Sequence, residues 1–177
     1  MGIMAWILEG RDLFTNDVLQ NVLDLVLHVT GTKSRPALEV RASGNLALYD
    51  PNRRKVVVNG IALWELCKRF VSIHAPAILA GFIAHEMGHH LLILQGRVFR
   101  DGVLIELGEM TSDYTAGAAL ALAGYGRSEV STFVGALKSV NFPQGDGEHG
   151  TNLQREQDVW SGYDVGVALR SRVNPIA

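Results

Sequence analysis

The chain has 177 residues, of which 47% are hydrophobic and 19% charged, and its formal net charge is -2. This length suits one domain with a substantial core, so we expect a single domain over residues 1–177. The composition argues against a disordered chain, and the small net charge gives no basic surface for a nucleic acid.

The first elements of the chain are predicted to be one helix and a small sheet. Residues 16–29 carry a broad apolar face at helical spacing, with Asn16 in the position of an N-cap. Three strand-like pieces follow, with the sequences ALEVRA, NLALY and KVVVN. The last two flank DPNRR, in which Asp50 and Pro51 suit the first two positions of a type I turn. This pattern predicts a β-hairpin.

The rest of the chain has a helical pattern. Pro76 suits the first turn of a helix, and Gly96 marks the end of that helix. After the glycine-rich loop PQGDGEHG, Thr151 and Gln154 form a capping-box signal for the last helix. We therefore expect helices over 61–73, 76–94, 103–123 and 128–140 and a last one from 151 onward. One helix, a small sheet and then only helices predict an α+β fold.

No part of the sequence indicates secretion or a membrane. The N-terminal stretch lacks the basic residues of a signal peptide, and no uninterrupted run reaches the ~18 apolar residues of a membrane span. Cys67 is the only cysteine, so a disulfide within the chain is impossible, and we expect Cys67 in the core. The expectation is a soluble, cytoplasmic protein without a transmembrane segment. Trp6, Trp64 and Trp160 are expected to be core or boundary residues.

The apolar stretch FIAHEMGHHLLI contains three histidines and a glutamate. On a helix, His85 and His89 lie one turn apart on the same face, and Glu86 lies beside that face. This H-E-x-x-H pattern is typical of zinc sites in which two histidines bind the metal and the glutamate is a general base. The alternative is that His85 and His89 are hydrogen-bonded core residues and Glu86 is a boundary charge. His90 points about 100° away and is expected to support the site rather than to bind the metal.

A catalytic zinc needs a third protein ligand, and the segment IELGEMTSDYTAG offers two glutamates. Glu109 has Asp113 one helical turn beyond it, which could accept a hydrogen bond from a ligand histidine and fix its tautomer. Glu106 has Met110 at the equivalent position, so Glu109 is favoured as the ligand. Small residues follow at 116–119, which would let two helix backbones approach closely.

The motifs HEMGHH, EMTSDYTAG and EHGTNLQRE, in this order, resemble the gluzincin metallopeptidases of the thermolysin-like clan. They look most like small neutral zinc metallopeptidases and the soluble core of the membrane-bound prenyl-protein and heat-shock peptidases. The resemblance covers about residues 80–166. It differs at Ser112, where many relatives have Ala, and at Gly150, where the membrane-bound relatives have Pro.

The resemblance implies a zincin-like fold and a set of site residues. His85, His89 and Glu109 would bind Zn²⁺, and Glu86 would be the general base. Asp113 would orient a ligand histidine. His149 would face the developing oxyanion, and Arg155 would hold the segment that carries His149 near the site.

The function that this pattern favours is hydrolysis of peptide bonds by a metal-activated water, with a peptide or protein as substrate. A peptide would add to an edge strand beside the cleft, either KVVVN or NLALY. One alternative is a zinc-binding, peptidase-like regulatory module without turnover, and another is a metal-free helical interaction protein. The remaining histidines, His28 and His74, are expected to be structural or exposed to solvent.

Overall fold

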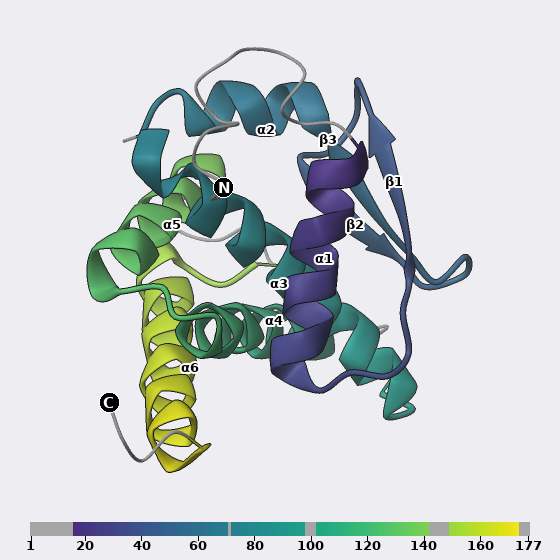
Figure 1. Cartoon of the computed structure of the whole chain (residues 1–177). Helices are drawn as coiled ribbons and strands as arrows, with labels where there is room; N and C mark the ends of the chain where they lie inside the picture. Colours follow the sequence, from purple (N-terminus) through teal and green to yellow (C-terminus); the bar gives the residue numbers. More distant parts are fainter. Residues whose placement is uncertain (1–15, 71, 98–101, 142–148, 174–177) are drawn as a thin grey trace.

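The computed structural model describes residues 16–70, 72–97, 102–141 and 149–173, without the side chains of Asn16, Val18, Ser72, residues 102–107 and Val173. These residues form six α-helices, a short 3-10 helix and a three-stranded sheet, so the α+β class is confirmed (Figure 1). The elements are α1 (Asn16–Thr30), β1 (Ala37–Arg41), β2 (Ala47–Asp50), β3 (Lys55–Asn59), α2 (Gly60–Cys67), the 3-10 helix η3 (Ser72–His74), α3 (Ala75–Leu94), α4 (Gly102–Leu122), α5 (Arg127–Val140) and α6 (Asn152–Val173).

The prediction of one helix over residues 61–73 is wrong at the C-terminal end of that helix. The structure has α2, which ends at Cys67, and then the separate 3-10 helix η3. After α2 the backbone hydrogen bonds change to the 3-10 pattern: the N–H groups of Arg69 and Phe70 donate to the carbonyls three residues before them. The other five helices begin close to their predicted starts, and α1, α3, α4 and α5 also end close to their predicted ends. Asn16 is the first residue of α1, and Trp6 lies outside the described residues.

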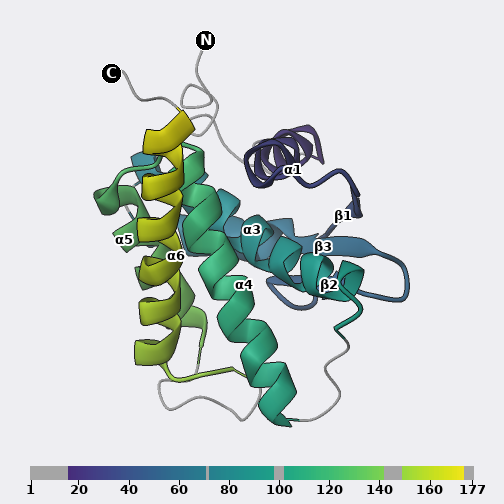
Figure 2. The ribbon, with the colours of Figure 1, turned by 90° about the horizontal axis from the view of Figure 1, so that it is seen from below.

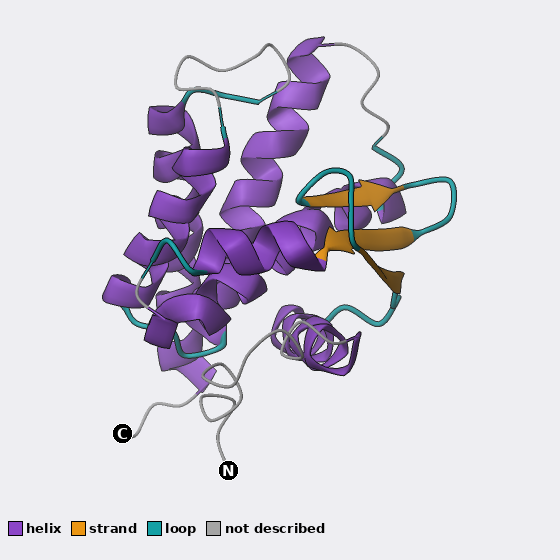
Figure 3. Ribbon diagram, turned by 90° about the horizontal axis from the view of Figure 1, so that it is seen from above, coloured by secondary structure: helices purple, strands orange, loops and turns teal. Residues whose placement is uncertain are grey.

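The sheet has the strand order β1-β3-β2, with β3 in the middle. β2 and β3 pair antiparallel, which confirms the predicted hairpin. The carboxylate of Asp50 accepts hydrogen bonds from the backbone N–H groups of Asn52 and Arg53 and so stabilises the turn. β1 pairs with β3 in parallel, from Ala37 opposite Lys55 to Arg41 opposite Asn59. Figure 3 shows the three strands together on one side of the molecule, and Figure 2 shows α4, α5 and α6 on the other.

Helix α3 lies at the centre of the fold and contacts α1, α4, α5 and β2. It is buried without a break from Ala75 to Gly88. Among the described residues it is the one helix long and apolar enough to cross a membrane by length and composition, although 78% of its apolar window is buried inside the protein. A buried core helix passes the same test, so this observation is weak support for a membrane span.

Helices α4 and α6 lie side by side (Figure 2). Gly162 of α6 meets the backbone of Tyr114, and Gly166 meets the backbone of Ala118. The residue numbers of the contacts increase together along both helices, so α4 and α6 run in the same direction. In sequence, α5 lies between them. Gly117 likewise meets the carbonyl of Val159 on α6. Gly117, in the small-residue stretch of α4, therefore allows the backbones of α4 and α6 to lie close together.

The start of α6 is fixed by the predicted capping box. The Thr151 backbone N–H donates to the side-chain oxygen of Gln154 at 2.8 Å, and the Gln154 N–H donates to the Thr151 hydroxyl at 3.3 Å. This cap sets the first turn of α6, where Arg155 points into the protein and is only 6% exposed. Cys67 is buried, as predicted, and Trp64 and Trp160 are half-buried.

Candidate metal centre

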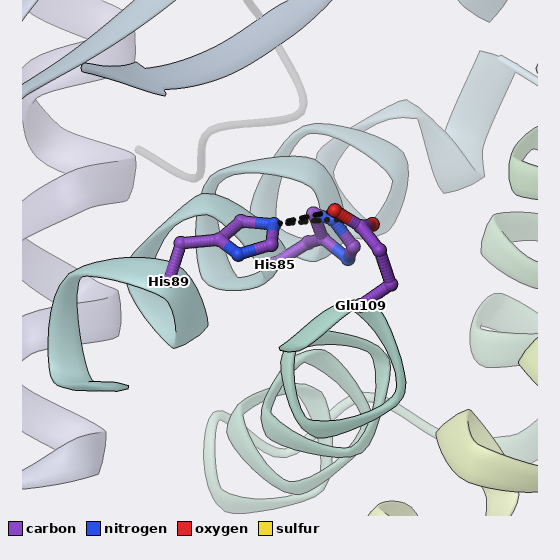
Figure 4. Close-up of side chains that lie close together, drawn as sticks. All are labelled: His85, His89 and Glu109. Atoms are coloured by element: carbon purple, nitrogen blue, oxygen red, sulfur yellow. Dashed lines mark hydrogen bonds and ion pairs between the residues drawn. The ribbon is translucent and has the colours of Figure 1, made fainter. Parts of the chain in front are cut away.

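Two neighbouring helices bring His85, His89 and Glu109 together (Figure 4). Both histidines come from α3, and the carboxylate of Glu109 comes from α4. Nε2 of His85 lies 3.1 Å from Oε2 of Glu109, and Nε2 of His89 lies 3.1 Å from Oε1. The two Nε2 atoms are 3.3 Å apart. The sequence therefore identified all three members of this cluster.

Asp113 orients the ring of His85. Nδ1 of His85 lies 2.8 Å from Oδ1 of Asp113, which is completely buried. Because a carboxylate can only accept, Nδ1 carries the proton and donates it in this bond. In the neutral ring, Nε2 then has a free lone pair that points at Glu109 and His89. This is the arrangement predicted for Asp113.

Arg155 holds Asp113 from the other side. Its Nε donates to Oδ2 at 2.6 Å and one terminal nitrogen donates to Oδ1 at 2.9 Å, which makes the pair bidentate. The same terminal nitrogen lies 4.0 Å from Oε2 of Glu109. His85, Asp113 and Arg155 thus connect α3, α4 and α6 through buried polar contacts.

The charges around the cluster favour a cation. Burial lowers the pKa of His85, but the carboxylates of Asp113 and Glu109 outweigh this effect and raise that pKa to about 10. Burial raises the pKa of Glu109, but His85 and His89 outweigh it and hold that pKa well below its usual value. The pKa of Asp113 is also lowered, because His85 and Arg155 outweigh the effect of burial. The pocket therefore favours positive charge: without a metal His85 holds a proton, and a metal ion that binds Nε2 of His85 would take the place of that proton.

One atom of this pocket has an unmet bonding requirement. Oε2 of Glu109 is buried and makes no well-aligned hydrogen bond among the described residues, although Nε2 of His85 lies 3.1 Å away. A buried carboxylate oxygen without a hydrogen bond is costly unless a cation neutralises it. One ligand atom from each of His85, His89 and Glu109 lies within 4.8 Å of the other two. This group could hold a metal ion, and its donor set fits one.

Glu86 lies beside the cluster and is 6% exposed. Burial raises the pKa of Glu86, while the nearby His85 and His89 oppose this shift. Because Glu86 directly follows His85 on α3, its side chain lies next to the helix face that carries the two histidines.

His149 reaches the same site from the segment before α6. Its Nε2 lies 3.7 Å from Oε2 of Glu109, and its side chain is 35% exposed. The structure therefore brings His149 to the rim of the cluster. The competing ligand Glu106 lies outside the residues whose side chains are described.

The other histidines lie outside the cluster. His28 is exposed, and His74 bonds to the hydroxyl of Thr132 at 2.7 Å. His90 is 1% exposed, and burial lowers its pKa, which favours the neutral ring. Its partner is Tyr49 of β2, at 2.8 Å from Nδ1. Tyr49 could not be found from the sequence, because no spacing connects this strand residue to α3.

A second feature, away from the cluster, is an open cavity of about 530 Å³ at the end of β1 and the start of α2. None of the cluster residues lines it. The lining residues are Val40, Arg41, Ala42, Gly60, Ile61, Trp64 and Glu65.

Comparison of the chain with protein-family models, with curated proteins and with solved structures found no match.

Proposed function

We propose that this protein is a zinc-dependent metallopeptidase with a zincin-like fold. The observation that carries the proposal is the convergence of His85, His89 and Glu109, with Asp113 on the far nitrogen of His85. Three protein ligands from two helices, with Glu86 beside them, match the ligand set of a catalytic zinc site. The order of the motifs, HEMGHH before EMTSDYTAG, supports the gluzincin resemblance.

The candidate ligand atoms are close enough together for one zinc ion. Tetrahedral zinc with bonds of about 2.0–2.2 Å places its ligand atoms about 3.3–3.6 Å apart. The two Nε2 atoms are 3.3 Å apart, and each lies 3.1 Å from a different oxygen of Glu109. Calcium and magnesium prefer sites made of oxygen ligands, which two imidazoles do not provide.

In this proposal each residue near the metal has a separate role. Zinc, when bound, supplies a Lewis acid that makes water nucleophilic near neutral pH and polarises a peptide carbonyl. Glu86 accepts the proton of the attacking water and hands it to the leaving nitrogen. His149 donates a hydrogen bond to the negative charge that develops on the carbonyl oxygen. Asp113 and Arg155 hold His85 in the orientation that binding requires.

The sheet limits where a substrate strand can bind. β3, the KVVVN strand, is paired on both sides and has no open edge, so that alternative is wrong. β2, from the NLALY segment, pairs only with β3 among the described residues and contacts α3. We therefore assign the substrate edge to β2, where an extended peptide adds by main-chain hydrogen bonds.

The test is the substitution Glu86→Gln in zinc-loaded protein, assayed with a library of internally quenched peptides. Glu86→Gln keeps the size of the side chain and removes its ability to take a proton. We expect one zinc per chain in both proteins and a loss of cleavage of at least about 100-fold in the variant. Glu65→Gln, an exposed change on α2, is the matched control and should cleave like the parent.

Each outcome has a clear meaning. Cleavage at the parental rate by Glu86→Gln would refute the assigned mechanism. Zinc binding without cleavage by the parent would favour a peptidase-like binding module. A parent that binds no zinc would refute the metal centre itself.

A further inference from the structure

Helix α3 presents different groups to two different neighbours. His85 and His89 point toward Glu109 on α4. Glu86 and His90 are four residues apart, so they project from a second face of α3, one turn apart. At the level of His90, this second face meets β2. The proposed general base therefore shares its face of the helix with the residue that contacts the edge strand.

The contact between His90 and β2 is specific. The Tyr49 hydroxyl lies 2.8 Å from Nδ1 of His90, and the two rings meet edge to face with centroids 5.2 Å apart. Nε2 of His90 lies 3.0 Å from the backbone carbonyl of Ser34. Because a carbonyl only accepts, Nε2 carries the proton, and Nδ1 of the neutral ring accepts from Tyr49.

This chain of contacts fixes a strand that has one open edge. Tyr49 pairs with Val56 of β3 in the hairpin, and its side chain bonds to α3. Ser34 lies just before β1, so His90 also connects α3 to the segment that leads into the other outer strand. β2 has four residues, and Tyr49 is the one among them whose side chain hydrogen-bonds to α3 in the described part of the chain.

We infer that Tyr49 and His90 are positioning residues, which hold β2 at one height along α3 so that a peptide added to β2 passes Glu86. This inference rests on the proposed function. Neither residue is placed on the substrate or the metal, because both act through the position of β2. Their loss should weaken peptide binding rather than the chemical step.

The first test measures the strand directly and needs no activity. Tyr49→Phe removes the hydroxyl and keeps the ring. Hydrogen–deuterium exchange of residues 47–50, in the zinc-loaded full chain, should become about three- to tenfold faster, as expected for the loss of one partly buried hydrogen bond. Unchanged exchange in β2 would overturn the inference.

The matched control is Tyr163→Phe. The Tyr163 hydroxyl donates to the backbone carbonyl of Tyr125 at 3.1 Å, so this variant also loses one hydrogen bond, but on α6. It should leave exchange in β2 unchanged. Equal acceleration of β2 in both variants would reveal a global loss of stability and would count against a local positioning role.

The second test separates binding from chemistry on the best-cleaved peptide of the library. Tyr49→Phe should raise KM about three- to tenfold and leave kcat within about twofold of the parent. A fall in kcat with unchanged KM would overturn the inference. Absence of cleavage by the parent would refute the proposed function instead, and the exchange experiment would then decide alone whether the pair anchors β2.

Substitution of His90 provides a rescue test. His90→Gln keeps one donor for Ser34 and one acceptor for Tyr49, whereas His90→Leu keeps neither. Exchange in β2 and KM should stay near the parental values in the Gln variant and rise in the Leu variant. Zinc content is measured in both, because His90 follows His89. Parental exchange in His90→Leu at full zinc content would contradict the inference.

Discussion

Gly88 of α3 lies directly against Ser112 of α4. A Cβ atom on Gly88 would lie 2.6 Å from Cα of Ser112 and 2.9 Å from its Cβ, so no larger residue fits without displacing the backbone. Both positions are next to the centre, since His89 follows Gly88 and Asp113 follows Ser112. The crossing of these two helices therefore sets the distance over which Glu109 reaches the histidines.

The substitution Gly88→Ala is expected to push α3 and α4 apart. Because the nearest blocking atom is the backbone Cα of Ser112 on α4, the overlap should cost about 1–3 kcal/mol in the free energy of unfolding. Zinc affinity should fall with it, since Glu109 moves away from His85 and His89. Urea unfolding and a zinc competition titration measure the two effects.

Gly135→Ala is the control for this prediction. It makes the same change within a helix, but the nearest atom, 3.2 Å away, belongs to the ring of Phe70, a side chain that can move. Its effect on stability should be smaller, and its zinc affinity should equal that of the parent. Wild-type zinc affinity in Gly88→Ala would show that the helix crossing does not set the ligand distances.

The substitution Asp113→Asn should weaken metal binding without removing a ligand. The bond between Asp113 and Nδ1 of His85 fixes the tautomer that leaves Nε2 free. Loss of such a supporting carboxylate typically lowers metal affinity about 10- to 100-fold. Stability should fall as well, because the buried guanidinium of Arg155 loses its bidentate partner.

Zinc affinity of Asp113→Asn is measured by competition with a chromophoric chelator, at a temperature where circular dichroism shows folded protein. Asp164→Asn on α6 is the control, since Asp164 is an exposed partner of Arg127. Equal zinc affinity in all three proteins would mean that the orientation of His85 does not depend on Asp113.

Asp158 should make stability depend on pH. Its Oδ2 is buried without a hydrogen bond among the described residues, and burial, together with Asp113, raises its pKa to about 6 against the effect of Arg155. In the unfolded chain the carboxyl has its usual pKa of about 3.9. The stability that it contributes is therefore present below pH 4 and is lost as the pH rises through 6.

Asp158→Asn removes this titration. The variant should gain stability relative to the parent between pH 4 and pH 7, by about 1 kcal/mol once the partial exposure of the side chain is taken into account. Urea unfolding of both proteins at several pH values, at one zinc concentration, measures the difference. A difference that stays constant with pH would contradict the raised pKa.

The sequence predicted those parts of the fold and the site that depend on local spacing. Five helices were found from periodicity, proline and glycine signals, and the hairpin from its turn residues. The cluster of His85, His89 and Glu109 followed from helical spacing and from the acidic residue at 113. Helix ends and the hairpin turn are determined by residues close together in the sequence. A metal ligand can be recognised at a distance, because few residue types can bind a metal.

The remaining features depend on contacts between distant segments. The parallel pairing of β1 with β3 has no turn signature, because the two strands are not adjacent in sequence. The pairing of Tyr49 with His90 spans 41 residues, and neither residue marks the other in the sequence. The early end of α2 at Cys67 was missed because apolar residues continue at helical spacing beyond it.

The most direct test of the metal centre is an anomalous difference map at the zinc absorption edge, from crystals grown with zinc. The account predicts one peak per chain, about 2.0–2.2 Å from Nε2 of His85, Nε2 of His89 and an oxygen of Glu109. A map without a peak between these three residues, or with its peak at other ligands, would contradict the account.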